Sequence, residues 1–395
     1  MGLTYEKLIR FDLVEDLEKE ILANENLRDR AAEFLKIFYE IMGVDQFIRE
    51  LPSSPYATEP IIRSEMVRAI GSTLAIEGIM IGEEEIKKSF QKTSSKESPE
   101  ERVSIHKKNS DNVYKYIIDL VEKYEGEFIC AEEHIKKIHK LFTDKIDYVG
   151  NTPGQYRDIQ TIFGEPPKDS LCETRSDINT AISNLITWLN KGSSGFLSGN
   201  IIVKAIMAHY YLTEIHPFGD GNGRTARALE ALVLYSNHIN TYCFWSLANF
   251  WSRNRGKYIQ YLDGIRSTYN PWEFLLWGTK GYLQEIKRIK GLVLKKVKEL
   301  MFIDYARYLW RNKPRKTSRR FMIALELLVD SGRIPLDKFY SLPVVRALYS
   351  SMSGPTKIRD FTKMKDENLI NIISESNKDF IEPNFSILEK LQYKI

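Results

Sequence analysis

One short loop gathers the residue types that phosphate chemistry requires. Glycine stands at alternate positions in Gly219-Asp220-Gly221-Asn222-Gly223, and the residues that follow begin a helical pattern. Glycine allows backbone conformations that other residues avoid, so such a loop can turn several N–H groups inward together. The first turn of a helix adds further free N–H groups and the positive end of the helix dipole. The pattern therefore predicts a cradle for an anion such as phosphate.

Four side chains around the loop supply the remaining groups. Arg224 and Arg227 are three residues apart and share one helix face, from which they can bind separate phosphates. Asp220 is a hard oxygen ligand for Mg²⁺. His216, whose type titrates near neutrality, can take a proton from an attacking hydroxyl. A base, a metal ligand and a phosphate clamp suffice for phosphoryl-type transfer, because its catalysis is mostly positioning and charge stabilisation.

Two helical patterns must hold this loop in place. Residues 199–215 are apolar on all sides, as in a buried helix, and residues 224–237 are rich in Ala and Leu, which favour helix. The loop is neither a Walker loop nor a Rossmann fingerprint, because no strand pattern precedes it and no Lys follows it. A glycine-rich turn between helices is usually only a turn. The histidine, the carboxylate and the two arginines together favour a functional site here.

The rest of the chain is predicted to be mainly helical. Helices are expected over 15–42, 63–77, 106–123, 131–143, 175–190, 254–268 and 271–310, with a connector over 45–60 and a polar loop over 91–104. Residues 155–170 alternate apolar and polar side chains before a glycine and two prolines, which predicts a short β-hairpin. Residues 311–365 then hold thirteen Lys or Arg against four Asp or Glu. Helices followed by two strand-like runs predict a small separate domain of the winged-helix type.

Composition indicates an ordinary globular protein. The chain is 43% hydrophobic and 28% charged, and its net charge of +4 is too small to demand a polyanionic partner. The cysteines Cys130, Cys172 and Cys243 have no metal-ligand spacing, which favours a reducing compartment. The N-terminus lacks the apolar core of a signal peptide, and no later stretch is apolar enough to span a membrane. We therefore expect a cytoplasmic protein without membrane contact.

The loop resembles the motif of the Fic family, H-x-F-x-[DE]-G-N-G-R-x-x-R. Every defined position is filled, by His216, Phe218, Asp220, Gly221, Asn222, Gly223, Arg224 and Arg227. The helical pattern from about 105 to 290 also looks like the Fic fold, so the resemblance covers roughly half of the chain. It implies an enzyme that binds ATP with Mg²⁺ (or Mn²⁺) and transfers AMP to a Ser, Thr or Tyr hydroxyl of a target protein, releasing pyrophosphate.

The resemblance also implies roles for single residues. His216 would be the general base, Asp220 the metal ligand and Phe218 a buried anchor of the loop. The nucleotide would be bound by Gly221, Asn222, Gly223, Arg224, Thr225, Ala226 and Arg227. Tyr258 lies where Fic proteins place an aromatic near the adenine, although tyrosines at helical spacing are more often core. The 155–170 hairpin resembles the flap that pairs with an extended target segment. Its lead-in, residues 154–157, matches that pattern in outline, and the alternative is that the lead-in has only a structural role.

A second segment resembles the inhibitory motif of the family, [ST]-x-x-x-E-[GN]. It is filled by Thr73, Glu77 and Gly78, at the end of a helix expected over about 63–78. A carboxylate at the end of a buried helix needs a cationic partner, because burying an unpaired charge is costly. Arg227 is the candidate, and a Glu77–Arg227 pair would occupy the place of the γ-phosphate. The alternative is that Glu77 is only a solvated charge.

We therefore predict a mainly α protein, with a Fic-type helical bundle, a β-hairpin flap and a small C-terminal winged-helix domain. The expected divisions are an N-terminal helical region (1–104), a Fic catalytic domain (105–310) and the winged-helix-like domain (311–395).

The predicted activity is protein adenylyl transfer, to a target bound along the 155–170 flap or to the chain itself. The same loop can alternatively remove AMP or transfer another phosphate-containing group. A less favoured hypothesis of another class is that the chain is a DNA-binding regulator, or an adaptor that associates with itself as a homo-oligomer. In either case its Fic domain would only sense nucleotide. DNA bound by such a regulator would meet Lys357, Arg359, Lys363 and Lys365.

Overall fold

The chain folds as two compact units. The structure is a computed structural model, which describes residues 9–51, 55–78, 99–124, 126–146, 151–164, 167–240, 245–375 and 378–392. One unit contains residues 1–52 and 58–290, and the other contains residues 53–57 and 291–395. The division falls inside the long helix α12 (Trp272–Trp310) rather than at its end, where the sequence analysis placed it. The second half of α12 belongs with the C-terminal unit because its apolar face lies in that unit's core.

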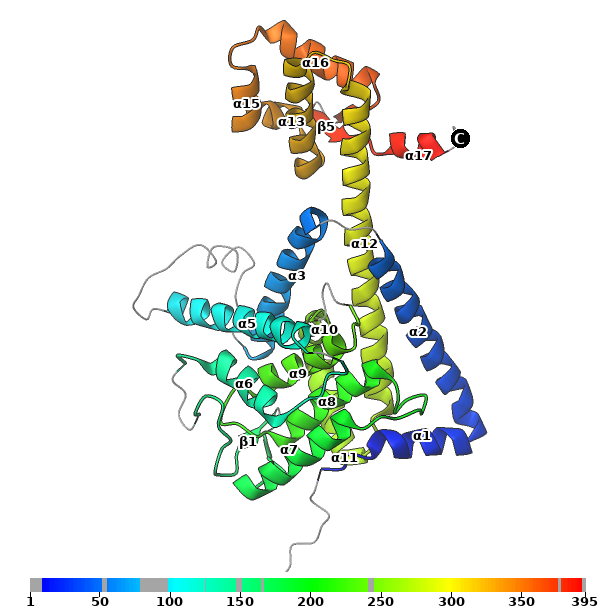
Figure 1. Cartoon of the computed structure of the whole chain (residues 1–395), viewed down its shortest axis with the longest axis vertical. Coiled ribbons are helices and arrows are strands. Elements are labelled where there is room, and N and C mark those ends of the chain that lie inside the picture. Colours follow the sequence, from blue (N-terminus) through cyan, green and yellow to red (C-terminus); the bar gives the residue numbers. More distant parts are fainter. Residues whose placement is uncertain are drawn as a thin grey trace, which may run out of the picture. The chain divides into compact units, whose positions relative to one another are not determined.

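The first unit consists of helices and one short hairpin (Figure 1). Its helices, besides the first part of α12, are α1 (Leu13–Ala23), α2 (Glu25–Glu50), α3 (Pro55–Ile76), α5 (Pro99–Glu122), α6 (Glu132–Thr143), α7 (Arg175–Asn190), α8 (Ile201–Ile215), α9 (Asn222–Ser236), α10 (Leu247–Arg253) and α11 (Arg255–Thr268). The strands β1 (Ile162–Phe163) and β2 (Lys168–Asp169) pair antiparallel. The predicted hairpin is confirmed but is shorter than the segment 155–170.

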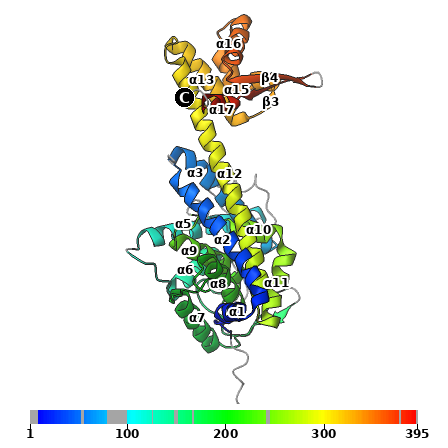
Figure 2. The same cartoon turned by 90° about the vertical axis from the view of Figure 1, so that its right-hand side faces the viewer.

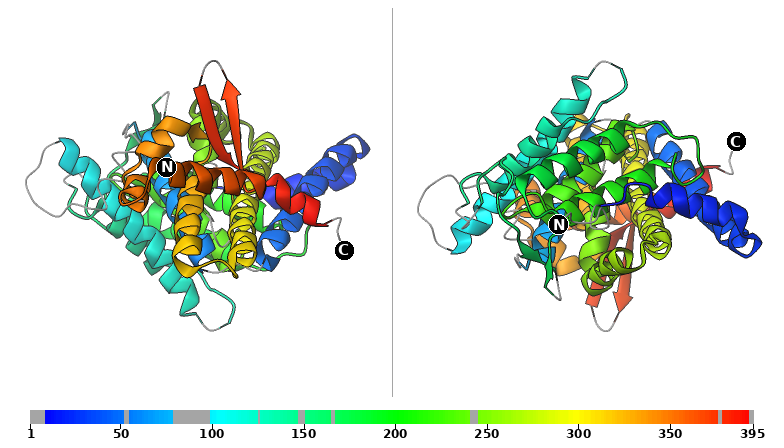
Figure 3. Two further views of the ribbon diagram at one scale, coloured as in Figure 1. Left: turned by 90° about the horizontal axis from the view of Figure 1, so that it is seen from above. Right: turned by 90° about the horizontal axis from the view of Figure 1, so that it is seen from below.

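The helices α8 and α9 form the centre of this unit. The side chains of α8 are buried around its whole circumference, which confirms the buried helix predicted from its uniformly apolar sequence. The helix α7 packs against α8, while α5 and α6 pack against α9. In Figure 3 the green helices α7 to α9 lie side by side. The loop that joins α8 to α9 is therefore held between two elements that the core fixes on several sides.

Three predicted boundaries were wrong. The helix expected over 15–42 is two helices, because Asn24 adopts an extended backbone (φ −113°, ψ 112°) between α1 and α2. The connector expected over 45–60 is mostly helical, since α2 continues to Glu50 and α3 begins at Pro55. Proline is well tolerated at the first helical position, where its missing N–H breaks no bond. Of the loop expected over 91–104, the described part is already helical, because α5 begins at Pro99.

Two further expectations concern membrane-spanning segments and the cysteines. Among the described residues, no helix combines the length and the apolar character needed to cross a membrane. Cys130 and Cys172 are buried free thiols, and burial raises the pKa of each. Cys243 lies outside the described residues.

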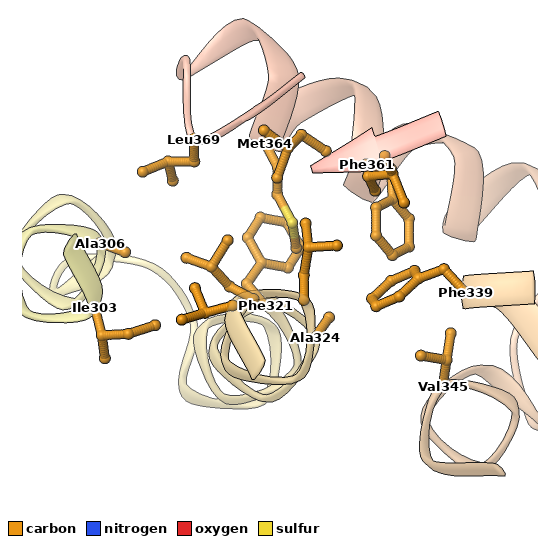
Figure 4. Close-up of a cluster of buried hydrophobic side chains, with 14 of the residues drawn as sticks. Ile303, Ala306, Phe321, Ala324, Phe339, Val345, Phe361, Met364 and Leu369 are labelled. Atoms are coloured by element: carbon orange, nitrogen blue, oxygen red, sulfur yellow. The ribbon is translucent and has the colours of Figure 1, made fainter. Parts of the chain in front are cut away.

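The second unit combines helices with a three-stranded antiparallel sheet. Its elements after α12 are α13 (Arg315–Ser331), β3 (Ile334–Pro335), α14 (Leu336–Ser341), α15 (Pro343–Tyr349), α16 (Gly354–Asp366), β4 (Ile370–Glu375), β5 (Lys378–Pro383) and α17 (Ser386–Gln392). The strand order is β3-β5-β4, so Ile381 of β5 pairs with Ile334 on one side and Ile372 on the other. Figure 2 shows β3 and β4 in this unit. The core gathers Phe321, Phe339, Phe361 and Met364 (Figure 4).

Candidate active site

The loop between α8 and α9 begins and ends with left-handed backbone. Asn200 caps the start of α8, because its side-chain oxygen accepts the N–H groups of Ile202 and Val203. His216 caps the end of α8 and adopts φ 48°, ψ 57°, and Gly221 precedes α9 at φ 77°. Left-handed backbone is uncommon for a residue other than glycine and often marks a functional site. The two turns place the histidine and the N-terminus of α9 on the same loop.

Asn222 closes this loop from within. Its side-chain oxygen accepts the N–H of Phe218 at 2.9 Å, and its amide nitrogen donates to the Phe218 carbonyl at 2.8 Å. The Phe218 ring is fully buried and stacks on the His139 imidazole, with 3.7 Å between ring centroids. The phenylalanine therefore anchors the loop in the core rather than facing the cavity.

Replacing Asn222 by alanine should destabilise the first unit. The change leaves the buried N–H and carbonyl of Phe218 without their side-chain partners, which costs about 2 kcal/mol. We expect a lower midpoint of thermal unfolding, followed by circular dichroism on the full chain. Asn237→Ala is the matched control, because Asn237 lies at the other end of α9 and bonds to the Val233 carbonyl at a partly exposed position. Equal midpoints for the two variants would contradict the role of Asn222.

His139 of α6 holds the other side of the loop. Its Nδ1 accepts the N–H of Gly154 at 2.9 Å, so the ring proton lies on Nε2, which donates to the Asp220 carbonyl at 2.9 Å. Burial lowers the pKa of His139 to about 4, so the ring stays neutral in this arrangement. Asn151 accepts the N–H of Asp220 at 3.2 Å. No local pattern around residue 139 signals this contact, which depends on the packing of α6.

The His216 side chain is oriented as a proton acceptor. Its Nδ1 donates to the Thr213 carbonyl at 3.3 Å, which leaves the lone pair on Nε2. The Phe163 ring of β1 stacks on the imidazole, with 4.1 Å between centroids and 16° between planes. The pKa of His216 is lowered to about 4, mainly by burial and also by the charges of Arg157 and Lys168, against the opposing effects of the Thr213 carbonyl and Glu77. The expectation that His216 titrates near neutrality was therefore wrong, and the imidazole is unprotonated at neutral pH.

Arg157 ties the hairpin segment to the loop. Its Nε donates to the His216 carbonyl at 2.7 Å and its guanidinium also donates to the Cys172 carbonyl at 2.7 Å. Its backbone N–H donates to the Pro217 carbonyl at 3.0 Å. This buried arginine satisfies backbone carbonyls that the helix end leaves open. The lead-in before the hairpin thus has a structural part in the site.

The two arginines of α9 are buried and point to different partners. The Arg224 guanidinium bonds to the Asp220 carboxylate at 2.5 Å and to Nδ1 of His106 at 3.1 Å. The Arg227 guanidinium bonds to the Thr73 hydroxyl at 2.9 Å and to the Glu77 carboxylate at 2.6 Å. Neither side chain is directed into open solvent.

The Glu77 carboxylate lies over the start of α9. A Cβ atom built on Gly223 would come within 2.4 Å of its Oε1, so only glycine leaves room for this contact. Burial alone would raise the pKa of Glu77, but the charge and hydrogen bond of Arg227 outweigh it and lower the pKa. A negative charge is also favoured at a helix N-terminus. The carboxylate thus takes a position that would suit a phosphate.

A cavity of about 410 Å³ connects these groups. Of the residues predicted for the site, those that line it are Glu77, His216, Asp220, Gly221, Asn222, Gly223, Arg227 and Tyr258. Arg224, Thr225, Ala226, Thr73 and Gly78 do not line it, and the first four of these are buried. Residues that sequence reasoning missed also line it, among them Phe163, Lys168, Arg255 and Asp263.

Tyr258 belongs to the cavity wall and to the core at once. Its hydroxyl bonds to Nε2 of His209 at 2.8 Å, and Nδ1 of His209 bonds to the Glu230 carboxylate at 2.8 Å. Trp251 donates to the same carboxylate at 3.0 Å. His209 is completely buried. The tyrosine hydroxyl is therefore engaged in the core, and the residue contributes to the cavity only as part of its wall.

Comparison with known proteins identifies the central part of the chain. Residues 129–234 match the Fic/DOC family. The protein adenylyltransferase Fic of Culex quinquefasciatus is 35% identical over 127 residues, which are 31% of this chain and 23% of the relative. The protein adenylyltransferase fic-1 of Caenorhabditis elegans is 45% identical over 53 residues, 13% of this chain and 10% of that protein. The chain thus spans less than a quarter of the length of these curated relatives.

Solved structures of Fic proteins have a fold similar to that of this chain. A Fic family protein from Desulfovibrio desulfuricans superimposes with a TM-score of 0.57 at 16% identity, over 89% of this chain and 95% of that one. Fic-1 from C. elegans gives 0.52 at 20% identity, over 66% and 72% of the two chains. The buried helix pair and its glycine-rich loop belong to a mainly helical fold that these structures share. Residues 129–234 of the chain thus match a Fic domain in sequence.

Proposed function

We propose that the chain is a protein adenylyltransferase, which transfers AMP from ATP to a Ser, Thr or Tyr hydroxyl of a protein. The observation that carries the proposal is the single cavity lined by the unprotonated His216 imidazole, the N-terminus of α9 and Arg227. The curated relatives of the central segment are named protein adenylyltransferases, which supports the same reaction.

The chemistry follows from these groups. The oxygen of the acceptor hydroxyl forms a bond to the α-phosphorus of ATP, and its proton passes to Nε2 of His216. The bond from that phosphorus to the bridging oxygen breaks, and pyrophosphate leaves. The N–H groups at Gly221 to Gly223 and the dipole of α9 stabilise the charge that develops on the phosphate oxygens. The Arg227 guanidinium binds the distal phosphates once it is free of Glu77.

Asp220 is the residue that would hold a divalent metal. Its carboxylate lines the cavity beside the cradle, and hard oxygen ligands suit Mg²⁺ or Mn²⁺. Mg²⁺ at phosphates usually takes only one or two carboxylates from the protein. When bound, the metal would neutralise phosphate charge.

The hairpin supplies the docking edge for the acceptor protein. Ile159 and Ile162 are 75% and 67% exposed, an unusual exposure for two apolar side chains so close together. The strand β1 pairs only with β2 among the described strands, so its outer edge can receive an extended segment. That segment can belong to another protein or to a second copy of this chain, which would then modify itself.

The N-terminal helix α3 acts as a brake on the reaction. The Glu77–Arg227 pair occupies the arginine that the γ-phosphate requires, so ATP binds without correct alignment of its α-phosphate. The bond from Arg227 to Thr73 fixes the guanidinium in this blocked position. We assign the regulatory role to residues 1–104, the catalytic role to the domain predicted over 105–310 and the winged-helix fold to 311–395, with residues 291–310 of α12 packed in the C-terminal unit. Two buried free thiols support a reducing cytoplasmic location.

The alternatives have less support. Removal of AMP or transfer of another phosphate-containing group would use the same loop. A DNA-binding role would rest on α16, where Arg359, Lys363 and Lys365 are exposed. The sheet beside it carries the acidic residues Glu375, Asp379 and Glu382, which would repel phosphates.

The direct test is to incubate the purified chain with ATP, Mg²⁺ and a cell extract, and to identify modified proteins by mass spectrometry. We expect Ser, Thr or Tyr residues that carry the added mass of AMP, and a signal that disappears without Mg²⁺. Salt-dependent binding of duplex DNA, without any labelled protein, would favour the regulator instead.

A further inference from the structure

The flap strand is clamped over the catalytic histidine by a charged cluster that the proposed mechanism does not use. The cluster consists of Lys168 on β2, Glu214 on α8, and Asp263 and Arg266 on α11. The Lys168 ammonium lies 3.2 Å from the Glu214 carboxylate and 2.6 Å from that of Asp263. The Arg266 guanidinium lies 3.7 Å from the other Glu214 oxygen and donates to the Asp169 carbonyl of β2 at 2.7 Å. Two helices thereby hold one strand of the hairpin.

Glu214 is the centre of this cluster. Its side chain is only 1% exposed, and a carboxylate so deeply buried requires cationic partners. It lies in the last turn of α8, between Thr213 and His216 in the sequence. The Thr213 carbonyl accepts a hydrogen bond from Nδ1 of His216. One turn of helix therefore orients the imidazole and anchors the flap.

The clamp holds Phe163 against the imidazole. The Phe163 ring stacks on His216 at 4.1 Å between centroids. The Lys168 ammonium lies 5.1 Å from the centre of the same ring, and the Arg266 guanidinium lies 6.0 Å from it. Cations at these distances attract the aromatic ring. One face of the imidazole is therefore covered by an apolar ring that is itself fixed by two charged side chains.

We infer that Phe163 and its anchor Lys168 are positioning residues that keep water from His216, so that the acceptor hydroxyl comes from a docked polypeptide. The inference rests on the proposed adenylyl transfer. It adds the structural feature that favours transfer of AMP to protein over hydrolysis of ATP by water. Water and a protein hydroxyl are chemically equivalent acceptors at the α-phosphorus. With water the products are AMP and pyrophosphate, and with a protein hydroxyl they are AMP-protein and pyrophosphate. In both cases the acceptor proton passes to His216. The flap selects the protein because its strand edge brings the hydroxyl in while Phe163 covers the imidazole.

The test measures the partition of AMP between protein and water. The parent is the full chain with Glu77→Gly, incubated with α-labelled ATP, Mg²⁺ and a cell extract, and both protein-bound label and free AMP are quantified. Phe163→Ala removes the covering ring. Lys168→Met removes the anchor and leaves Glu214 paired with Arg266, so the buried carboxylate keeps a cation. Asp169→Asn is the matched control, because its side chain is exposed on the same strand and only its backbone carbonyl is used.

We expect Phe163→Ala and Lys168→Met to reduce protein-bound label about tenfold and to raise the ratio of free to bound AMP at least fivefold. Asp169→Asn should match the parent. A merely structural loss would lower both products together, so an unchanged ratio in both variants overturns the inference and leaves the proposed function standing. A parent that labels no protein overturns the proposed function, and the inference with it. ATP binding by calorimetry, expected to match the parent, checks that each variant is folded.

Discussion

Replacing His216 by alanine should lower adenylyl transfer about a thousandfold while ATP still binds with nearly the affinity of the parent chain. A positioned general base typically contributes a factor of about 10² to 10⁴. We expect a value well inside that range, because the Nδ1 bond to the Thr213 carbonyl and the Phe163 ring hold Nε2 in one orientation. The phosphate cradle consists of backbone N–H groups of other residues and survives the change.

Initial rates of protein labelling with α-labelled ATP, with binding measured separately by calorimetry, give the two quantities. His238→Asn is the matched control, since His238 is exposed and shares the left-handed backbone that asparagine tolerates. The control should keep the parent rate. If the His216→Ala chain retained a tenth of the parent rate, another group would have to accept the proton, and His216 would be only a structural residue.

The sequence located the loop because its candidate residues are neighbours in the chain. Residues 216–227 carry the histidine, the carboxylate, the glycines and both arginines in one segment, and local rules for glycine and helix N-termini apply to them directly. Local rules did not predict that Arg227 lines the cavity while Arg224 does not. The same holds for α8, whose uniformly apolar sequence required burial. Fold class followed because the helical patterns were long and frequent.

The remaining parts of the site come from elements far apart in sequence. His139 lies on α6 and Arg157 lies before β1, and both act by hydrogen bonds to backbone carbonyls of the loop. Such bonds leave no spacing pattern that could be read in advance. The pKa of His216 could not be predicted either, because its main cause is burial under the flap and the helices. The connector predicted over 45–60 was wrong in part because Pro55 stands at the first position of α3, and proline is favoured at helix starts as well as in linkers.

The contact between Glu77 and Arg227 could not be derived from local sequence patterns, although both charges are visible in the sequence. The residues are 150 positions apart, and only the packing of α3 on α9 brings them together. A resemblance of motif suggested the pair, and the 2.6 Å bond gives it geometry. The bond from Arg227 to Thr73 and the contacts between the flap and α8 are of the same kind. Each joins elements that are distant in sequence, and each depends on how the helices pack.

Replacing Glu77 by glycine should raise adenylyl transfer about tenfold, equivalent to about 1.4 kcal/mol in the barrier. The change removes the carboxylate from Arg227 and from the space above Gly223, so the guanidinium can bind the γ-phosphate. Because Arg227 is buried and loses its anionic partner, the variant without ligand should unfold at a lower temperature than the parent. ATP replaces that partner, so ATP should raise the unfolding temperature of the variant more than that of the parent.

Labelling rates and thermal unfolding with and without ATP measure the two effects of this substitution together. Glu59→Ala is the matched control, because Glu59 is exposed on the same helix α3 and does not line the cavity. Glu77→Gln, which keeps the size and removes the charge, should fall between parent and Glu77→Gly, since the amide still fills the space but holds Arg227 weakly. The brake would have to be abandoned if Glu77→Gly labelled protein at the parent rate and gained no extra stabilisation from ATP. The carboxylate would then be an ordinary partner for a buried arginine, because a group that competes with the γ-phosphate cannot be removed without changing both measurements.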